Sequence, residues 1–230
     1  MPLETVFLDA GGVLLYPNWW RVSDALAIQG VAVSPEALVR ADPPARRELD
    51  DMGVIGGTTD ASRGWLFFDL VLAHAGIPRS DKTAAALAEL HAYHRASNLW
   101  EYVPANVVPA LEALRARGLR LVVVSNANGT LLAHMERLGL TSRFDDILDS
   151  QDEGVEKPDP RFFEIALARS GARKDATIHV GDLYHVDVVG ARNAGLRGVL
   201  LDEANLRPDA DCPRVSSLEE LVTQIAAGRF

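Results

Sequence analysis

Short segments rich in Val, Ile and Leu alternate along this chain with helical segments, and this alternation restricts the fold more than any other feature. We expect the apolar runs to be buried strands of a parallel sheet, because strands covered on both faces are apolar throughout. These runs are residues 5–9, 119–125, 176–181 and 197–201, with a weaker one at 146–148. The helical segments of the same region are 104–117, 129–138, 160–170 and 184–194, each followed by a glycine. Such alternation predicts an α/β fold with a Rossmann-like, doubly wound parallel sheet.

Residues 16–102 interrupt this alternation, because they show helical periodicity and no convincing strand. The expected helix starts in this segment are Ser34-Pro35, Asp60 and Ser80-Asp81. All four tryptophans of the chain fall here: Trp19, Trp20, Trp65 and Trp100. The sequence therefore predicts two domains. They are an α/β core of residues 1–15 and 103–230, and an inserted helical cap of residues 16–102.

Charge and composition restrict the partners and the compartment. The chain has 32 acidic and 23 basic residues, a formal net charge of -9, and its basic residues are scattered. Nucleic acid is therefore not an expected partner, because it needs a concentrated basic surface. We also expect no membrane partner, since no apolar run approaches the ~20 residues that span a bilayer and the first residues lack a secretion signal. A single cysteine, Cys212, fits a reducing compartment, which predicts a cytoplasmic protein.

Polar side chains follow three of the predicted strands at the point where each strand ends. Asp9 follows Val-Phe-Leu, Ser125-Asn126 follows four apolar residues, and Asp182 follows Ile-His-Val-Gly. Ligands of open α/β sheets bind beyond the carboxyl ends of the strands, so we expect these side chains to meet in one pocket. Lys157, on a loop before a predicted helix, is a fourth candidate for the same pocket.

In order and spacing, these stretches resemble the four motifs of the haloacid dehalogenase-like (HAD) hydrolase superfamily. The matching residues are Asp9 to Leu14 for motif one, Ser125 for motif two, Lys157-Pro158 for motif three, and Gly181-Asp182 with Asp187 for motif four. The resemblance spans nearly the whole chain, and residues 16–102 correspond to the cap that the family inserts after its first motif. It implies hydrolysis of a small phosphomonoester through an aspartyl-phosphate, which divides one difficult step into two easier ones.

The resemblance assigns the phosphate-binding and catalytic roles. Asp9 would be the nucleophile that attacks phosphorus. The ammonium of Lys157 would neutralise Asp9 and the phosphoryl oxygens, and the hydroxyl of Ser125 would hold those oxygens in place. Backbone amides near Gly11 and Gly12 would contribute further hydrogen bonds to the phosphate.

The resemblance also implies a magnesium site. A carboxylate approaches a phosphate dianion only with the help of cations, and hard oxygen ligands suit Mg²⁺. The implied ligands are the side chains of Asp9, Asp182 and Asp187 and the backbone carbonyl of Gly11. For Asp187, a place in the first turn of a helix, favoured by the helix dipole, is the alternative. For Asn126, phosphate binding and capping of the following helix are both open.

One position departs from the family pattern. Most phosphatases of this superfamily carry a second aspartate two positions after the nucleophile, as general acid and then base, where this chain has Gly11. Such assistance is worth about 10²- to 10⁴-fold, so its loss favours substrates with good leaving groups, such as acyl, anomeric or aryl phosphates. A substitute acid or a protein with little turnover are the other outcomes. The nearest candidates for a substitute are Tyr184 and His185.

Two other functions are compatible with the sequence. The dehalogenases of the superfamily also lack this second aspartate, and they use the same nucleophile on carbon without a metal. Against this reading, the chain keeps the Gly181-Asp182 pair of a metal site and has Gly-Gly-Val, not Tyr-Gly-Thr, in motif one. A catalytically weak protein that binds phosphate or a partner is the other alternative. A small phosphorylated metabolite is the expected partner, and both monomer and homodimer stay open.

Several residues are assigned to packing. Close packing of helix on sheet explains the small residues that follow motif four: Gly190, Ala191 and Ala194. His179 lies inside a predicted strand and is expected to be a buried, hydrogen-bonded histidine. Aromatic residues of the insertion are expected to form its own core. Only Trp19 and Trp20, which follow motif one closely, are considered as residues that line the pocket.

Overall fold

A computed structural model describes residues 2–50 and 60–230, without the side chains of residues 60–63. The chain forms two compact units, Met1–Tyr16 with Val103–Phe230, and Pro17–Tyr102. The sequence-based boundary lies one residue earlier, before Tyr16. The hydroxyl of Tyr16 donates to the carbonyl of Gly12 at 2.9 Å and also contacts the carboxylate of Glu203. These contacts tie Tyr16 to the first unit.

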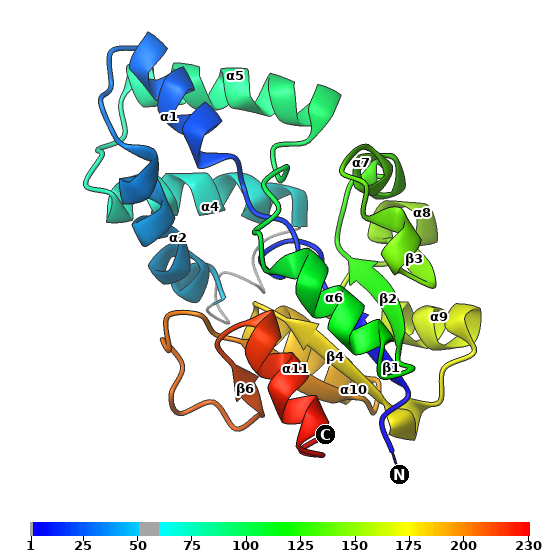
Figure 1. Ribbon diagram of the computed structural model, residues 1–230. Helices are drawn as coiled ribbons and strands as arrows, with labels where there is room; N and C mark the ends of the chain where they lie inside the picture. The colour runs from blue at the N-terminus through cyan, green and yellow to red at the C-terminus, as the bar shows by residue number, and fades with distance from the viewer. Residues whose placement is uncertain (1, 51–59) are drawn as a thin grey trace. The chain divides into compact units, whose positions relative to one another are not determined.

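The first unit is built on a parallel sheet (Figure 1). Its strands are β1 (Thr5–Leu8), β2 (Arg120–Ser125), β3 (Asp146–Asp149), β4 (Thr177–Gly181), β5 (Arg197–Leu201) and β6 (Arg214–Val215). The strand order is β3-β2-β1-β4-β5-β6, and each neighbouring pair is parallel. This order confirms the doubly wound α/β fold, whose ligand site is expected at the switch point beside β1. The sequence did not predict β6, because two residues are too short to show a pattern.

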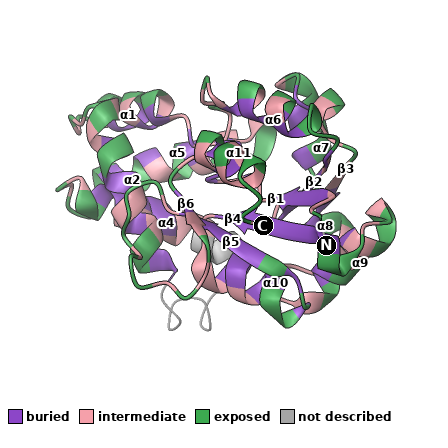
Figure 2. Cartoon of the chain, turned by 60° about the horizontal axis from the view of Figure 1, so that its bottom comes forward, coloured by how far each residue is buried: buried purple, intermediate pink, exposed green. Residues whose placement is uncertain are grey.

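Helices cover both faces of this sheet. They are α6 (Val107–Arg115), α7 (Leu131–Arg137), α8 (Ser150–Glu153), α9 (Pro160–Ser170), α10 (Val189–Asn193) and α11 (Leu218–Ala226). A π-helical segment, Tyr184–Val188, precedes α10, and two short 3₁₀ helices are Thr141–Arg143 and Lys174–Ala176. Figure 2 shows α6 and α11 on one face of the sheet and α9 and α10 on the other. The sequence analysis did not predict α8 or α11.

The strands supply the core of this unit. Val6, Phe7 and Leu8 of β1 are fully buried, and Phe7 packs in an apolar cluster with residues of β2 and α9. Gly190 is closely packed, but against the segment that leads into α9 and not against the sheet, because a Cβ at this position would lie 3.0 Å from Cα of Pro158. Because a central strand is buried on both faces, its residues are apolar, and the first position that can carry a charge is the residue that follows the strand.

The second unit is helical in its described part. Its helices are α1 (Trp19–Ile28), α2 (Pro35–Leu49), α4 (Asp60–His74) and α5 (Asp81–Ser97). The predicted starts are confirmed: Ser34 caps α2 by accepting from the amide of Ala37, and Ser80 caps α5 in a reciprocal pair with Thr83. The helix α4 begins at Asp60 as predicted, although the side chain of Asp60 lies outside the described residues.

Aromatic side chains form the core of the helical unit. Trp19 is 2% exposed, and its ring lies 6.0 Å from Phe67 and 5.8 Å from Phe68. Pocket lining is therefore wrong for Trp19, which packs inside its own unit. Trp20 is 49% exposed and lies beside the ring of Tyr102, at 5.7 Å between centroids.

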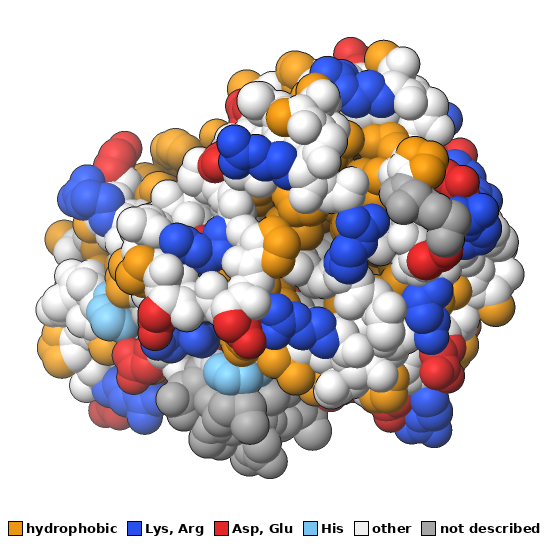
Figure 3. All heavy atoms as spheres, turned by 90° about the horizontal axis from the view of Figure 1, so that it is seen from below, with side chains coloured by type: hydrophobic (Ala, Val, Ile, Leu, Met, Phe, Trp, Pro, Cys, Tyr) orange, Lys and Arg blue, Asp and Glu red, His pale blue; other side chains and the backbone are white. Residues whose placement is uncertain are grey.

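The distribution of charged side chains on the surface agrees with the scattered basic residues of the sequence. On the face drawn in Figure 3, Lys and Arg side chains are scattered among acidic and neutral ones. Within the part of the chain that the structure describes, no helix has both the length and the apolar character of a bilayer-spanning segment.

Candidate active site

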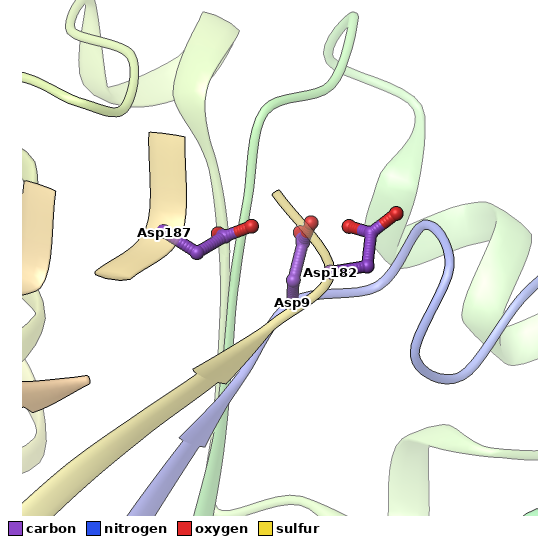
Figure 4. A group of neighbouring side chains, drawn as sticks. All are labelled: Asp9, Asp182 and Asp187. Carbon is purple, nitrogen blue, oxygen red and sulfur yellow. The ribbon is translucent and has the colours of Figure 1, made fainter. Parts of the chain in front are cut away.

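Three aspartates meet at the carboxyl end of the sheet. Asp9 directly follows β1, Asp182 directly follows β4, and Asp187 lies in the π-helical segment, as Figure 4 shows. One carboxylate oxygen from each lies within 4.8 Å of the others. Residues far apart in the sequence are thus brought together at the edge where the strand-end argument placed them.

Asp9 is held in a fixed orientation. Its backbone amide donates to the carbonyl of Val180 at 2.9 Å, which continues the pairing of β1 with β4. Its Oδ1 accepts from the amide of Ala10 at 2.8 Å and lies 2.9 Å from Nζ of Lys157. The side chain is 13% exposed. Burial raises the pKa of Asp9, and this outweighs the opposing effects of the Lys157 ammonium and the Ser125 hydroxyl.

Lys157 is fully buried between two carboxylates. Its Nζ lies 2.7 Å from Oδ1 of Asp187 and 2.9 Å from Oδ1 of Asp9. Burial alone would lower the pKa of Lys157, but the two neighbouring carboxylates raise it above its ordinary value. A lysine in this environment stays charged, and its ammonium directly faces the nucleophile proposed from the sequence.

The side chain of Asn126 positions Lys157 by hydrogen bonds to the backbone of Lys157. The Oδ1 of Asn126 accepts from the amide of Lys157 at 2.8 Å, and its Nδ2 donates to the carbonyl of Lys157 at 2.9 Å. Helix capping by Asn126 is wrong, because α7 begins at Leu131 with Thr130 as its N-cap. The side-chain amide of Asn126 therefore holds the backbone of Lys157 in place, and phosphate binding by Asn126 stays a prediction. Ser125 is buried at the end of β2, with its hydroxyl hydrogen-bonded to Asp9.

Asp187 accepts three hydrogen bonds from the protein. Its Oδ1 accepts from Nζ of Lys157 at 2.7 Å and from Nε2 of His179 at 3.0 Å, and its Oδ2 accepts from the amide of Leu183 at 3.0 Å. Burial would raise the pKa of Asp187, but the ammonium and these donors hold it well below its usual range. Asp187 is therefore a buried anion, and direct metal ligation by it stays a prediction.

Gly181 makes room for this carboxylate. A Cβ at Gly181 would lie 2.0 Å from Cγ of Asp187, closer than any non-bonded contact allows. His179 and Gly181 are two positions apart in β4, so they face the same side of the sheet. The sequence analysis missed their shared contact with Asp187. Its only trace in the sequence is a histidine and a glycine two positions apart in β4.

The loop after Asp9 forms a turn that uses one of the amides expected near the phosphate. Gly12 has a φ of +73°, and its amide donates to the carbonyl of Leu15 at 2.9 Å. That amide is therefore hydrogen-bonded within the turn, and phosphate binding by Gly12 stays a prediction. The backbone contacts proposed for Gly11 stay predictions. Glycine at position 11 also leaves no side chain two residues after the nucleophile.

The two candidates for a substitute acid lie in the π-helical segment. The hydroxyl of Tyr184 donates to Oδ1 of Asp211 at 2.5 Å, and Arg192 contacts the same carboxylate at 2.8 Å. The hydrogen bond to Asp211 raises the pKa of Tyr184. This commitment argues against Tyr184 as the acid. His185 packs edge-on against Tyr184, at 5.1 Å between centroids, and stays a candidate.

The chemistry of this cluster fits a hard divalent cation. Its donors are carboxylate oxygens, which are the ligands that Mg²⁺ prefers. One ammonium, on Lys157, neutralises only one of the three carboxylates. Asp9 and Asp182 would hold such a cation, and its charge would reduce the repulsion among the carboxylates.

The sequence profile of haloacid dehalogenase-like hydrolases matches residues 3–195. The chain belongs to this family. Among curated HAD relatives, ribulose-1,5-bisphosphate 5-phosphatase of Halopiger xanaduensis is 37% identical over 150 residues, which cover 64% of this chain and 61% of that protein. Haloacid dehalogenase-like hydrolase domain-containing protein 3 of Homo sapiens is 32% identical over 179 residues, covering 75% of this chain and 70% of that protein. The first of these matches thus spans less than two thirds of the relative's length.

Solved structures show the same HAD fold. A HAD hydrolase of Bacillus subtilis, in a crystal structure bound to magnesium, aligns with a TM-score of 0.69 at 18% identity, covering 98% of this chain and 99% of that one. At this identity the likeness concerns the fold. The family assignment itself comes from the sequence profile.

Proposed function

We propose that this HAD hydrolase catalyses the Mg²⁺-dependent hydrolysis of a small phosphomonoester, with Asp9 as the nucleophile. The observation that carries this proposal is the fully buried Lys157 ammonium, 2.9 Å from Oδ1 of Asp9, whose carboxylate lies within 4.8 Å of those of Asp182 and Asp187. A relative named as a sugar bisphosphate phosphatase supports phosphoryl chemistry on a small phosphorylated metabolite.

The proposed first step transfers the phosphoryl group to the protein. A carboxylate oxygen of Asp9 attacks phosphorus, the bond from phosphorus to the ester oxygen breaks, and the leaving oxygen takes the electron pair. That oxygen takes a proton from water, since Gly11 offers no acid. Lys157 stays charged and neutralises the transferring oxygens, while the Ser125 hydroxyl donates to one of them.

The second step hydrolyses the aspartyl-phosphate. Water attacks phosphorus, and the bond between phosphorus and the Asp9 oxygen breaks. The proton released by the attacking water neutralises the hydroxide left by the first step, and inorganic phosphate and the free carboxylate are released. Bound Mg²⁺, held by Asp9, Asp182 and the carbonyl of Gly11, would supply charge neutralisation for both steps. Without a general acid at position 11, we expect substrates with good leaving groups to react fastest.

The same proposal covers the role of the helical unit, the cellular compartment and the oligomeric state. We assign to residues 17–102 the role of the HAD cap, which selects the substrate. The free thiol of Cys212 fits a reducing compartment, so we place the reaction in the cytoplasm. The protein would act there as a monomer or homodimer on a small phosphorylated metabolite.

The test is a screen of phosphorylated metabolites with Mg²⁺ and with EDTA, run on the wild-type protein and on Asp9→Asn. We expect phosphate release that requires Mg²⁺ and is lost in Asp9→Asn. Asp175→Asn is the matched control, because Asp175 is an exposed carboxylate of the same unit. Equal loss in both variants would separate the activity from this site and contradict the proposal.

A second candidate function is favoured by one observation, the glycine at position 11. A metal-independent 2-haloacid dehalogenase would release halide from a 2-haloacid, and EDTA would not change its rate. A weak phosphate-binding protein would instead be stabilised by trifluoroberyllate, a mimic of the aspartyl-phosphate, while it releases no phosphate. Either result would replace the phosphatase proposal.

A further inference from the structure

His179 is a fully buried residue that the proposed reaction does not use. It lies in the middle of β4, between Ile178 and Val180. Its ring packs edge-on against Phe163, at 4.9 Å between centroids. Its Nε2 lies 3.0 Å from Oδ1 of Asp187.

The two ring nitrogens of His179 have different surroundings. Nε2 faces a carboxylate oxygen, whereas the buried Nδ1 has no hydrogen-bond partner among the described residues. An N–H group without an acceptor in a buried site is costly, so the proton belongs on Nε2. Nε2 of His179 is therefore the donor to Asp187.

This hydrogen bond extends a chain of contacts to the nucleophile. Oδ1 of Asp187 accepts from both His179 and Lys157, and Lys157 also contacts Asp9. The carboxylates of Asp187 and Asp9 compete for the ammonium of Lys157. Its Nζ lies 2.7 Å from Oδ1 of Asp187 and 2.9 Å from Oδ1 of Asp9. A donor on Oδ1 takes up part of the negative charge of Asp187 and so weakens its hold on Lys157.

The site around Asp187 is shaped to keep it in this place. Gly181 leaves the space that the carboxyl group fills, and the amide of Leu183 holds Oδ2 at 3.0 Å. With Oδ2 fixed from one side, Oδ1 can meet His179 and Lys157 at the same time. The arrangement fixes the direction from which Lys157 approaches Asp9.

We propose that His179 is a positioning residue, which holds Asp187 and thereby keeps the Lys157 ammonium shared with Asp9. The kinetic consequence rests on the proposed function. The contacts themselves do not, so they can be tested without any substrate.

Two substitutions at position 179 separate donation from packing. His179→Phe keeps an aromatic ring against Phe163 but removes the donor to Asp187. His179→Gln restores a donor, because its amide nitrogen reaches about as far along the side chain as Nε2. Thr177→Val is the control, since Thr177 is equally buried in β4 and donates to the carbonyl of Arg173 at 2.7 Å, away from Asp187.

In the kinetic test, we expect His179→Phe to lower kcat by about 10- to 100-fold, the order for loss of a hydrogen bond to a charged group, with a much smaller change in KM. His179→Gln should recover most of this loss. Thr177→Val should keep the wild-type kcat, even where its Tm falls as far as that of His179→Phe. Equal kcat for wild type and His179→Phe, or no recovery in His179→Gln, would overturn the proposal.

A second readout does not depend on activity. In NMR spectra of the full chain with Mg²⁺, we expect His179 to carry its proton on Nε2 and the Lys157 ammonium to give a protected signal. That ammonium signal should shift or broaden in His179→Phe and return in His179→Gln. A proton on Nδ1, or an unchanged Lys157 signal in His179→Phe, would refute the positioning role. A wild-type protein inactive on every phosphoester would defeat the proposed function and leave this result standing.

Discussion

Buried charged side chains are paired differently in the two units of the molecule. In the sheet unit, the fully buried Lys157 links carboxylates from distant parts of the chain, and its partner Asp187 is 30 residues away. In the helical unit, the buried Asp42 pairs with Arg46, one turn further along the same helix. The rest of that core is mainly apolar and aromatic.

This difference separates chemistry from packing. Buried charges from distant segments are costly to assemble, and they persist where each has a partner. Removing one member leaves an uncompensated charge, whereas removing an aromatic ring from the helical unit leaves a cavity. Substitutions in the two units should therefore differ in pH dependence and in their effect on turnover.

The largest effect is expected at the nucleophile. Asp9→Asn should reduce kcat/KM by at least about 10³-fold, because no other carboxylate occupies its place at the end of β1. Its Tm should equal or exceed the wild-type value, since burial raises the pKa of Asp9 and makes its charged form unfavourable in the fold. Activity assays with thermal unfolding check both parts, and a large fall in Tm would contradict the second.

Removing the shared cation should cost both activity and stability. Lys157→Met leaves Asp9 and Asp187 without their ammonium, and we expect the free energy of unfolding to fall by about 3–5 kcal/mol. Urea denaturation measures this change. The double variant with Asp187→Asn should recover part of the loss. A double variant less stable than Lys157→Met would show that the charge is not the cause.

A cavity in the helical unit should behave differently. Phe68 is 1% exposed and packs against the rings of Trp19, Trp65 and Trp100. Phe68→Ala should lower the free energy of unfolding by about 3 kcal/mol, the lower end for truncation of a buried Phe. This loss should be the same at pH 5 and pH 8 by urea denaturation. A marked pH dependence would break the distinction between the two units.

Acid should remove the contribution of Asp187. Its pKa is lowered in the folded protein, so its stabilising effect is present above the unfolded value of about 3.9 and is lost as pH falls through the folded pKa. The unfolding free energies of wild type and Asp187→Asn should differ at neutral pH, and the difference should begin to shrink as pH falls below about 4. Denaturation curves at several pH values test this convergence. A constant difference would show that Asp187 is not an anion in the fold.

The smallest effect is expected at Trp20. This side chain is 49% exposed beside Tyr102, so Trp20→Ala should change the free energy of unfolding by less than about 1 kcal/mol. Its neighbour Trp19, buried in the helical core, serves as the contrast. Equal losses at both positions would show that exposure does not separate them.

Local patterns in the sequence accounted for much of the fold. Apolar runs located β1, β2, β4 and β5, and the Ser34 and Ser80 caps marked helix starts. Elements that are short, such as β6, gave no such pattern. Within the site, Asp9 and Asp182 were found because each directly follows a strand, and Lys157 because its loop precedes a predicted helix. The family resemblance added Asp187.

What the sequence determined by itself is the α/β order of elements and the set of reactive groups at the strand ends, because periodicity and strand ends are local properties. Only the tertiary structure decided how those groups pair. Distances between segments decide the contacts from His179 through Asp187 and Lys157 to Asp9. They also decide the hydrogen bonds of Asn126 to the backbone of Lys157 and the turn in which the Gly12 amide is hydrogen-bonded. A hydrogen bond forms only when donor and acceptor lie about 3 Å apart, and the packing of the whole unit sets the distances between residues that are far apart in the sequence.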